Sequence, residues 1–138
     1  MTTIRTTCLL LALGAGLLGC DSAFSADDVY EENLSISQGV AGVLVTQSDT
    51  AGEGPGAIEG GQVDVFDGSA LVDGALTGDP RQTLTSSEDG FFELQLDDGE
   101  YVVTRPDSRT TYSSLAVSAA VVRCDFTDSE GGAAWSCR

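Results

Sequence analysis

Short runs in which apolar and polar residues alternate recur along most of the chain, and clusters of glycine and aspartate separate them. After residue 35 no segment keeps the i, i+3, i+4 apolar spacing of a helix over three turns. Alternation with a period of two is typical of half-buried strands, so the pattern predicts an all-β sandwich of about seven strands. The expected strands are residues 36–46, 62–66, 82–86, 91–96, 101–105, 115–126 and 134–137, with 69–72 as a further candidate.

Acidic residues in the stretch 86–103 fall where turns between strands are expected. If Asp98 and Gly99 form a two-residue turn, Leu96 lies opposite Tyr101, and the apolar side chains of the hairpin share one face. We therefore expect these acidic residues to lie in turns and on the surface rather than to take part in a reaction. Those expected in turns are Glu88, Asp89, Asp97 and Asp98, and those expected on the outward face or flanks are Glu93 and Glu100.

The preceding turn favours a three-residue loop at 88–90 with Gly90 in the left-handed conformation. This loop length sets Leu94 opposite Leu84, whereas a two-residue turn would set Leu94 opposite Thr85 and bury less apolar surface. We therefore expect Leu94 and Leu84 to pair.

A hairpin centred on residues 130–131 is predicted at the C-terminal end. Its register sets Cys124 opposite Cys137 and Phe126 opposite Trp135 on one face. In a non-hydrogen-bonded antiparallel pair the Cα atoms lie about 4.5 Å apart, within the range that a disulfide tolerates.

The first 19 residues combine one arginine with an apolar run from 8 to 18, too short to span a bilayer and typical of a secretory signal peptide. The sequence LLGC at 17–20 resembles the bacterial lipobox, so Cys20 is the predicted lipid-attachment site and new N-terminus. Leu18 departs from that pattern, in which small or hydroxylated residues are commoner. Cleavage after Ser25 is the alternative.

The expected organisation is a lipoprotein signal peptide (1–19), an acidic tether (20–34) and a β-sandwich domain with its C-terminal hairpin (35–138). The competing interpretation of the tether is a short amphipathic helix. Only four side chains could line the buried face of such a helix: Phe24, Val29, Tyr30 and Leu34.

All 22 acidic residues and five of the six arginines follow residue 19, which leaves a formal charge of −17 on a chain without Lys or His. Such a surface repels nucleic acid and anionic lipid headgroups. A composition of this kind is also typical of proteins adapted to high salt. We therefore expect no nucleic-acid partner.

Two cysteines remain once Cys8 leaves with the signal peptide and Cys20 carries lipid. In an exported chain a single remaining pair indicates a disulfide, Cys124 to Cys137. Free thiols or a metal pair are the alternative, and a metal pair lacks histidine or further cysteine partners.

The segments AIEGGQVDVF (57–66) and TSSEDGFFELQLDDGEYVV (85–103) resemble the signature of the carboxypeptidase regulatory-like domains. The resemblance implies a transthyretin-like (prealbumin-like) Greek-key sandwich related to the Cna B-type repeats. Asp98 departs from the signature, since proline is frequent there. Some relatives form a Lys–Asn isopeptide bond, which this Lys-free chain cannot form. Signature positions are occupied by Asp89, Gly90, Phe92, Leu94, Leu96, Gly99, Tyr101 and Val103.

Catalysis by a Ser/His or Cys/His pair has no base in this chain, and acids beside turn glycines are usually solvated, so we expect no enzyme and no cofactor. Calcium binding is a minor alternative, without the spaced loop of an EF-hand. Its candidate ligands are Asp64, Asp67, Asp73 and Asp79, or Asp89 with Asp97 and Asp98.

Carbohydrate binding is the stronger alternative, because sandwiches of this type are classed with carbohydrate-binding-like folds. It requires exposed aromatic faces, for which the candidates are Trp135, Tyr112 and Tyr30. Trp135 is expected in the core beside Phe126 instead. The favoured hypothesis is a lipid-anchored, non-catalytic module of the bacterial cell envelope for structural or protein–protein interaction, whose leaflet, periplasmic or surface side and partner stay open.

Overall fold

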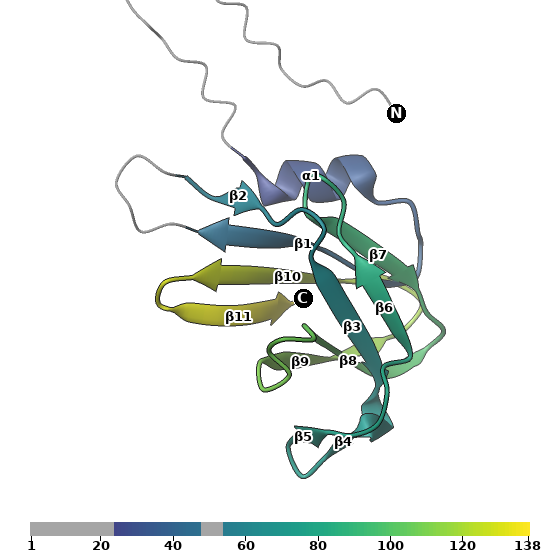
Figure 1. Cartoon of the computed structure of the whole chain (residues 1–138). Helices are drawn as coiled ribbons and strands as arrows, with labels where there is room; N and C mark the ends of the chain where they lie inside the picture. Colours follow the sequence, from purple (N-terminus) through teal and green to yellow (C-terminus); the bar gives the residue numbers. More distant parts are fainter. Residues whose placement is uncertain (1–23, 48–53) are drawn as a thin grey trace, which may run out of the picture.

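The computed structural model describes residues 24–47 and 54–138 (Figure 1). In this part of the chain two β-sheets pack face to face, one helix crosses an outer face, and a separate two-stranded sheet forms a small hairpin. Sheet I has the strand order β11-β10-β1-β7, with β2 beside the end of β1, and sheet II has the order β6-β3-β8-β9. The expected all-β sandwich is thereby confirmed. The elements are α1 (Ala26–Asn33), β1 (Gly39–Gln47), β2 (Gly56–Ala57), β3 (Gln62–Asp67), η1 (Gly68–Ala70), β4 (Leu71–Val72), β5 (Ala75–Leu76), β6 (Gln82–Thr85), β7 (Phe91–Gln95), β8 (Gly99–Thr104), β9 (Tyr112–Val117), β10 (Val121–Ser129) and β11 (Gly132–Cys137).

Strand β1 is apolar on both faces, and both faces are covered. Val40 and Leu44 point between the sheets into the main core, which β3, β8 and β10 also fill. Ala41, Val43 and Val45 point to the other side, where α1 covers them. Successive side chains of a strand alternate between its two faces. Because the apolar run of β1 is unbroken, each face must be buried against a different part of the protein.

The parallel pairing of β1 with β10 brings two backbones unusually close at Gly42. A Cβ built on Gly42 would lie 1.6 Å from the carbonyl oxygen of Cys124. The register is interrupted here, and the side chain of Asp125 accepts the N–H of Val43 at 3.0 Å in place of a backbone carbonyl. Only glycine fits this contact, because any other residue carries a Cβ.

The expected single strand over 115–126 is wrong. The chain forms β9 in sheet II, turns at 118–120 and enters sheet I as β10. Ala119 has a φ of 50°, and its N–H donates to Asp98 Oδ1 at 2.8 Å. Asp98, expected to form a hairpin turn with Gly99, therefore accepts a hydrogen bond from the turn between β9 and β10.

The pairing of Leu96 with Tyr101 is also wrong, because β7 pairs with β1 whereas β8 pairs with β3 and β9. The chain crosses from sheet I to sheet II at Asp97 and Asp98. Leu96 and Tyr101 do belong to the same buried core, but they approach it from opposite sheets. Tyr101 also donates its hydroxyl to the carbonyl of Asp97 at 2.8 Å, which anchors the start of β8.

The expected pairing of Leu94 with Leu84 fails for the same reason. Leu94 lies opposite Val40 in sheet I, and Leu84 lies opposite Val63 in sheet II. The left-handed conformation expected at Gly90 is confirmed, with a φ of 78°. The chain thus turns at 88–90 as expected but crosses between the sheets instead of forming a hairpin.

The C-terminal hairpin is confirmed in full. Cys124 lies opposite Cys137 and Phe126 opposite Trp135. The two cysteines form a disulfide with a Cα–Cα distance of 4.0 Å. The closed loop is short, and the chain-entropy relation gives a stabilisation of about 3 kcal/mol.

The flexible acidic tether expected over 20–34 is wrong for residues 24–34. The segment forms α1, and Phe24, Val29, Tyr30 and Leu34 pack on sheet I as the competing helical interpretation required. Residues 20–23 lie outside the described residues.

We predict that Gly42→Ala lowers the free energy of unfolding by at least ~2 kcal/mol, because the new methyl group overlaps the Cys124 carbonyl. Urea unfolding of both proteins measures the difference. Gly54→Ala is the matched control, since its Cβ meets no atom within 4 Å. Equal unfolding midpoints for Gly42→Ala and Gly54→Ala would contradict the close approach.

Candidate functional site: the helix clasp and the open edge of sheet I

Helix α1 begins and docks through features encoded in its own sequence. Ser25 caps the N-terminus, where its Oγ accepts the N–H of Asp28 at 3.3 Å, and Asp27 and Asp28 lie favourably in the first turn. The apolar side of α1 lies over β1 and β7. An isolated helix of eight residues is marginal in water, so docking on the sheet supplies most of its stability.

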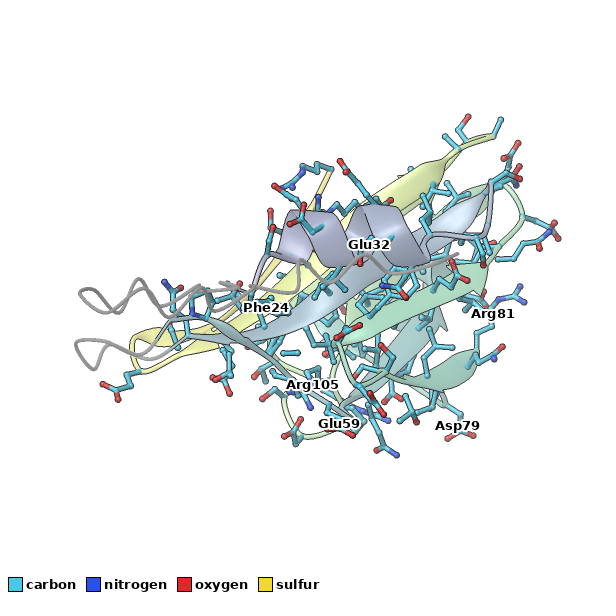
Figure 2. The ribbon with its side chains drawn as sticks, turned by 90° about the horizontal axis from the view of Figure 1, so that it is seen from above. Phe24, Glu32, Glu59, Asp79, Arg81 and Arg105 are labelled. Carbon is cyan, nitrogen blue, oxygen red and sulfur yellow. A yellow bond between two sulfur atoms is a disulfide. The ribbon has the colours of Figure 1, made fainter. Side chains whose placement is uncertain are left out.

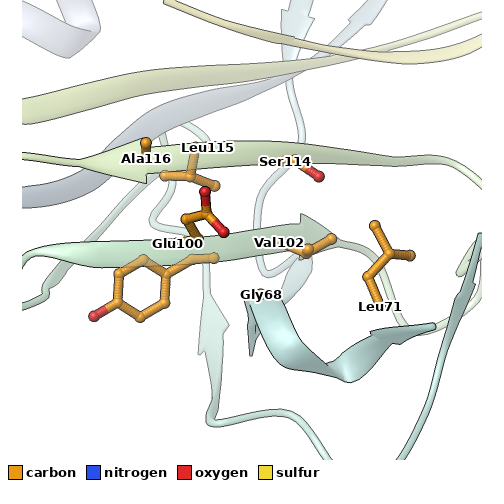
Figure 3. Close-up of a pocket in the computed structure, with 8 residues that line it drawn as sticks. Gly68, Leu71, Glu100, Val102, Ser114, Leu115 and Ala116 are labelled. Carbon is orange, nitrogen blue, oxygen red and sulfur yellow. The ribbon is translucent and has the colours of Figure 1, made fainter.

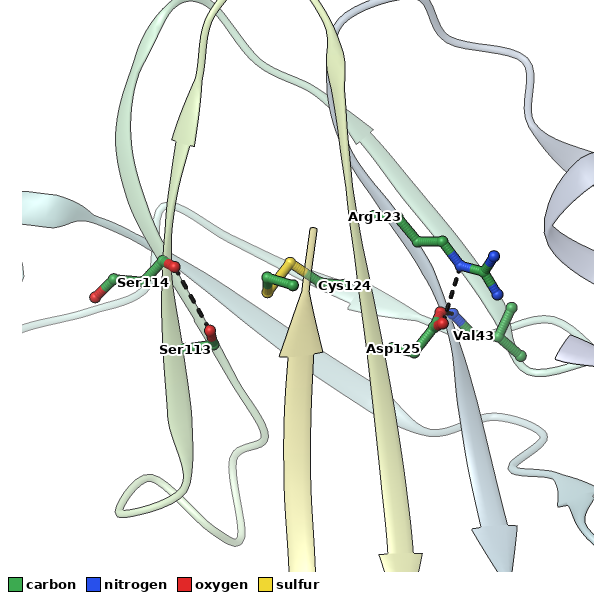
Figure 4. Close-up of a disulfide and its surroundings, with 7 residues drawn as sticks. Val43, Ser113, Ser114, Arg123, Cys124 and Asp125 are labelled. Carbon is green, nitrogen blue, oxygen red and sulfur yellow. Dashed lines mark hydrogen bonds and ion pairs between the residues drawn. A yellow bond between two sulfur atoms is a disulfide. The ribbon is translucent and has the colours of Figure 1, made fainter. Parts of the chain in front are cut away.

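Ion pairs hold the N-terminal end of α1 to Arg123 of β10 and to Arg138, the residue after β11. Arg123 Nη1 lies 2.7 Å from Asp27 Oδ1. Arg123 Nε lies 2.9 Å from Asp125 Oδ2 (Figure 4). Arg138 lies 3.9 Å from Asp27 and 4.0 Å from Asp125. We call Asp27, Tyr30, Arg123, Asp125 and Arg138 the clasp.

The two inner members of the clasp are largely withdrawn from water. The side chains of Arg123 and Asp125 are each 14% exposed, whereas that of Asp27 is 71% exposed. An ion pair that water reaches poorly is screened less by salt than a surface pair. Arg123 and Asp125 therefore form the fixed part of the clasp, and Asp27 is the part that α1 contributes.

Tyr30 joins the charged and apolar parts of the clasp. The Arg123 guanidinium lies 4.5 Å from the Tyr30 ring centroid, and the ring meets Phe91 edge-on at 6.4 Å. Burial raises the pKa of the Tyr30 hydroxyl above its ordinary value, and the positive charge of Arg123 opposes that rise. The neutral phenol is therefore the form that the docked helix favours.

The segment after α1 is also fixed to sheet I. The backbone N–H of Ser35 donates to Glu93 Oε2 at 3.0 Å, and the hydroxyl of Ser35 donates to the other carboxylate oxygen. Glu93, expected to face outward, does so and lies under the end of α1. Both ends of the helix thus have polar contacts with the sheet.

Strand β11 leaves an open edge beside the clasp. Arg123 and Arg138 exchange both backbone hydrogen bonds, so the N–H and C=O groups of Ala133, Trp135 and Cys137 point away from β10. The strand has a hydrogen-bonded neighbour on one side only. Such an edge can accept a further strand.

The neighbouring edge of sheet II is β9, which lies beside β11 in Figure 4. Neither β9 (YSSLAV) nor β11 (GAAWSC) contains a charged residue, although one residue in five of the chain is charged. Charged side chains are a common protection of open edges. This side of the sandwich lacks that protection.

The outer face of sheet II has a hollow of about 400 Å³ between β8, β9 and the β4–β5 hairpin (Figure 3). Its wall is partly apolar, with Leu71 from β4 and Val102 and Ala116 from the sheet, and Glu100 adds a carboxylate. The hollow has no signal in the sequence, because the 71–76 segment has no pattern that places it against the sheet. The exposed Val72 lies in the same hairpin.

Of the residues predicted for a site, Cys20 lies outside the described residues, and Cys124 and Cys137 are bonded to each other. The candidate calcium ligands are not brought together. Asp64 is buried and accepts a hydrogen bond from Thr83 at 2.6 Å, and Asp67 pairs with Arg81 at 2.8 Å. Within 24–47 and 54–138 no group of three or more acids, cysteines or histidines could hold a metal ion.

The aromatic residues proposed for sugar binding offer no exposed platform. All nine aromatic side chains of the chain lie in the described part, and none is exposed. Trp135 packs 5.1 Å from Phe126 and 6.1 Å from Phe92, as ring centroids, which confirms the expected core position. Tyr112 donates its hydroxyl to the carbonyl of Gly74 at 3.4 Å.

No protein-family model, curated protein or solved structure matches this chain. Among the residues that the structure describes, no helix has the length and hydrophobicity needed to cross a membrane.

We predict that the stability of the protein falls as pH rises above about 10, in part through Tyr30. The folded protein holds the Tyr30 proton more tightly than the unfolded chain, so this contribution is complete below the unfolded pKa and is lost at higher pH. Urea midpoints between about pH 9 and pH 11 should decrease less in Tyr30→Phe than in the wild type.

Tyr112→Phe is the control for this measurement, because Tyr112 lies on β9 of sheet II and its hydroxyl donates to the carbonyl of Gly74, which is not a member of the clasp. A tyrosinate absorbance titration of the same three proteins should place the Tyr30 transition above about pH 10. An equal alkaline loss in the wild type and Tyr30→Phe would show that burial of Tyr30 contributes nothing.

Proposed function

We propose that the protein is an exported, lipid-anchored and non-catalytic β-sandwich that binds another cell-envelope protein by accepting an extended segment at β11. The observation that carries this proposal is the open and uncharged edge of β11 in an otherwise strongly acidic protein. Backbone groups of Ala133, Trp135 and Cys137 supply the hydrogen bonds of such a contact.

The edge is also rigid, which favours binding. The disulfide holds Cys137 to β10, and Trp135 is wedged between Phe92 and Phe126. A strand that is already ordered loses little conformational entropy when it accepts a partner. An incoming segment can therefore pair with β11 without first ordering that strand.

Charge selects the class of partner. The chain after residue 19 has a formal charge of −17 and repels nucleic acid and other acidic macromolecules. An uncharged or basic extended segment approaches the β9–β11 side without that local repulsion. The partner is accordingly a protein with such a segment.

Two further features support the non-catalytic and anchored parts of the proposal. The chain has no histidine or lysine to serve as a base, and its acids mostly lie in turns or on outward faces. The LLGC sequence that ends at Cys20 supports a lipid anchor, and a β-sandwich is the fold class that the carboxypeptidase regulatory-like resemblance implies.

We predict that Ala134→Lys/Ser136→Lys abolishes recovery of the envelope partner after mild cross-linking in native membranes, because two exposed lysines protect the edge. The measurement is mass spectrometry of the proteins recovered with each variant. Gln82→Lys/Thr85→Lys on β6 is the matched control, since it adds the same charge to exposed positions of another edge strand.

Unchanged recovery with the β11 variant would contradict docking at this edge. Recovery of a bound polysaccharide instead of a protein would favour sugar binding, and turnover of any substrate would overturn the non-catalytic part of the proposal.

A further inference from the structure

The docking of α1 leaves very little chain between the predicted lipid and the folded domain. Phe24 already packs on sheet I, so only three residues lie between Cys20 and the first docked side chain, which makes four Cα–Cα steps. At about 3.5 Å for each residue, this length reaches at most about 14 Å. Without docking, the chain from Cys20 to Gly39 would have a root-mean-square reach of about 24 Å.

The same docking decides which end of the sandwich lies closest to the lipid. The N-terminal end of α1, with Phe24, lies toward the C-terminal end of β1 and the side of the β10–β11 turn, whereas the C-terminal end of α1 lies toward the start of β1 (Figures 1 and 2). Glu32, in the last turn, points away from the sheet in Figure 2. The chain therefore enters the domain from the direction of the β10–β11 turn.

The ion pairs of the clasp specifically stabilise the docked position of α1 on sheet I. Two of the five arginines after residue 19 meet Asp27, although acidic residues outnumber arginines in that part of the chain by 22 to five. Arg123 also stacks on Tyr30. Apolar burial and charge pairing thus act on the same short helix.

We propose that the clasp holds the domain directly against the lipid surface, with the β10–β11 turn toward the lipid and the β11 edge running outward from it. This inference rests on lipid attachment at Cys20 in the proposed function. Opening of the clasp releases up to 19 residues as a flexible tether and lets the domain stand off from the membrane. The closed clasp presents β11 to partners that lie at the membrane surface.

The test uses Trp135, the single tryptophan of the chain, as an energy-transfer donor. The full mature lipoprotein is placed in phosphatidylcholine vesicles that contain a trace of dansyl-labelled lipid. The opening variant is Asp27→Ala/Tyr30→Ala, which removes the helix side of the clasp without altering the sandwich strands. Glu32→Ala is the control, because it removes a charge from the exposed side of α1.

Transfer from Trp135 to the lipid should fall about twofold or more in the opening variant and stay unchanged in Glu32→Ala, since the mean distance from the surface increases. Hydrogen exchange of the α1 amides in the same samples should accelerate in the opening variant alone. Equal transfer in all three proteins, or rapid α1 exchange in the wild type, would overturn the inference.

Mass spectrometry of the membrane-extracted protein separates the two proposals. A Cys20 without lipid overturns the anchored function and the lipid contact together, while the exchange data still show whether the clasp is closed. A lipidated Cys20 with an open helix leaves the anchored function standing and removes only the clasp.

Discussion

The double-sided burial of β1 is the constraint on which the rest of the structure depends. A strand with apolar side chains on both faces is stable only where both faces are covered. Sheet II covers one face with the main core, and α1 covers Ala41, Val43 and Val45 on the other. Residues 24–34 are consequently part of the folded domain, and their docking would decide where a lipid on Cys20 holds the sandwich.

Strand positions could be predicted from the sequence far better than strand partners. Alternation tells which residues share a face, and Leu84, Leu94, Leu96, Tyr101 and Val103 do share one core. Alternation does not tell whether two such residues are neighbours in one sheet or face each other across two sheets, because burial is equal in both cases. The C-terminal hairpin was predictable because the opposed cysteines fixed its register.

Two features of the fold had weak signals or none. The break between β9 and β10 falls at Ser118, Ala119 and Ala120, where neither glycine nor proline marks a turn, and Ala119 adopts a left-handed conformation that is rare for it. The docking of α1 did have a signal, since the run GVAGVLV in β1 is too continuously apolar for a strand with one wet face. The acidic residues of 26–33 concealed it by making the segment resemble a linker.

The distribution of charge connects the clasp with the open edge. Arg138 follows the last residue of β11, and its guanidinium lies near both Asp27 of α1 and Asp125 of β10. The disulfide one residue earlier fixes the direction in which Arg138 leaves the sheet. A segment that pairs with β11 would restrain Arg138 further and so favour the closed clasp, while an open helix would leave Arg138 without the charge of Asp27. In the proposed function, the helix contact that would limit the distance to the lipid and the strand that would accept a partner are therefore linked through Arg138.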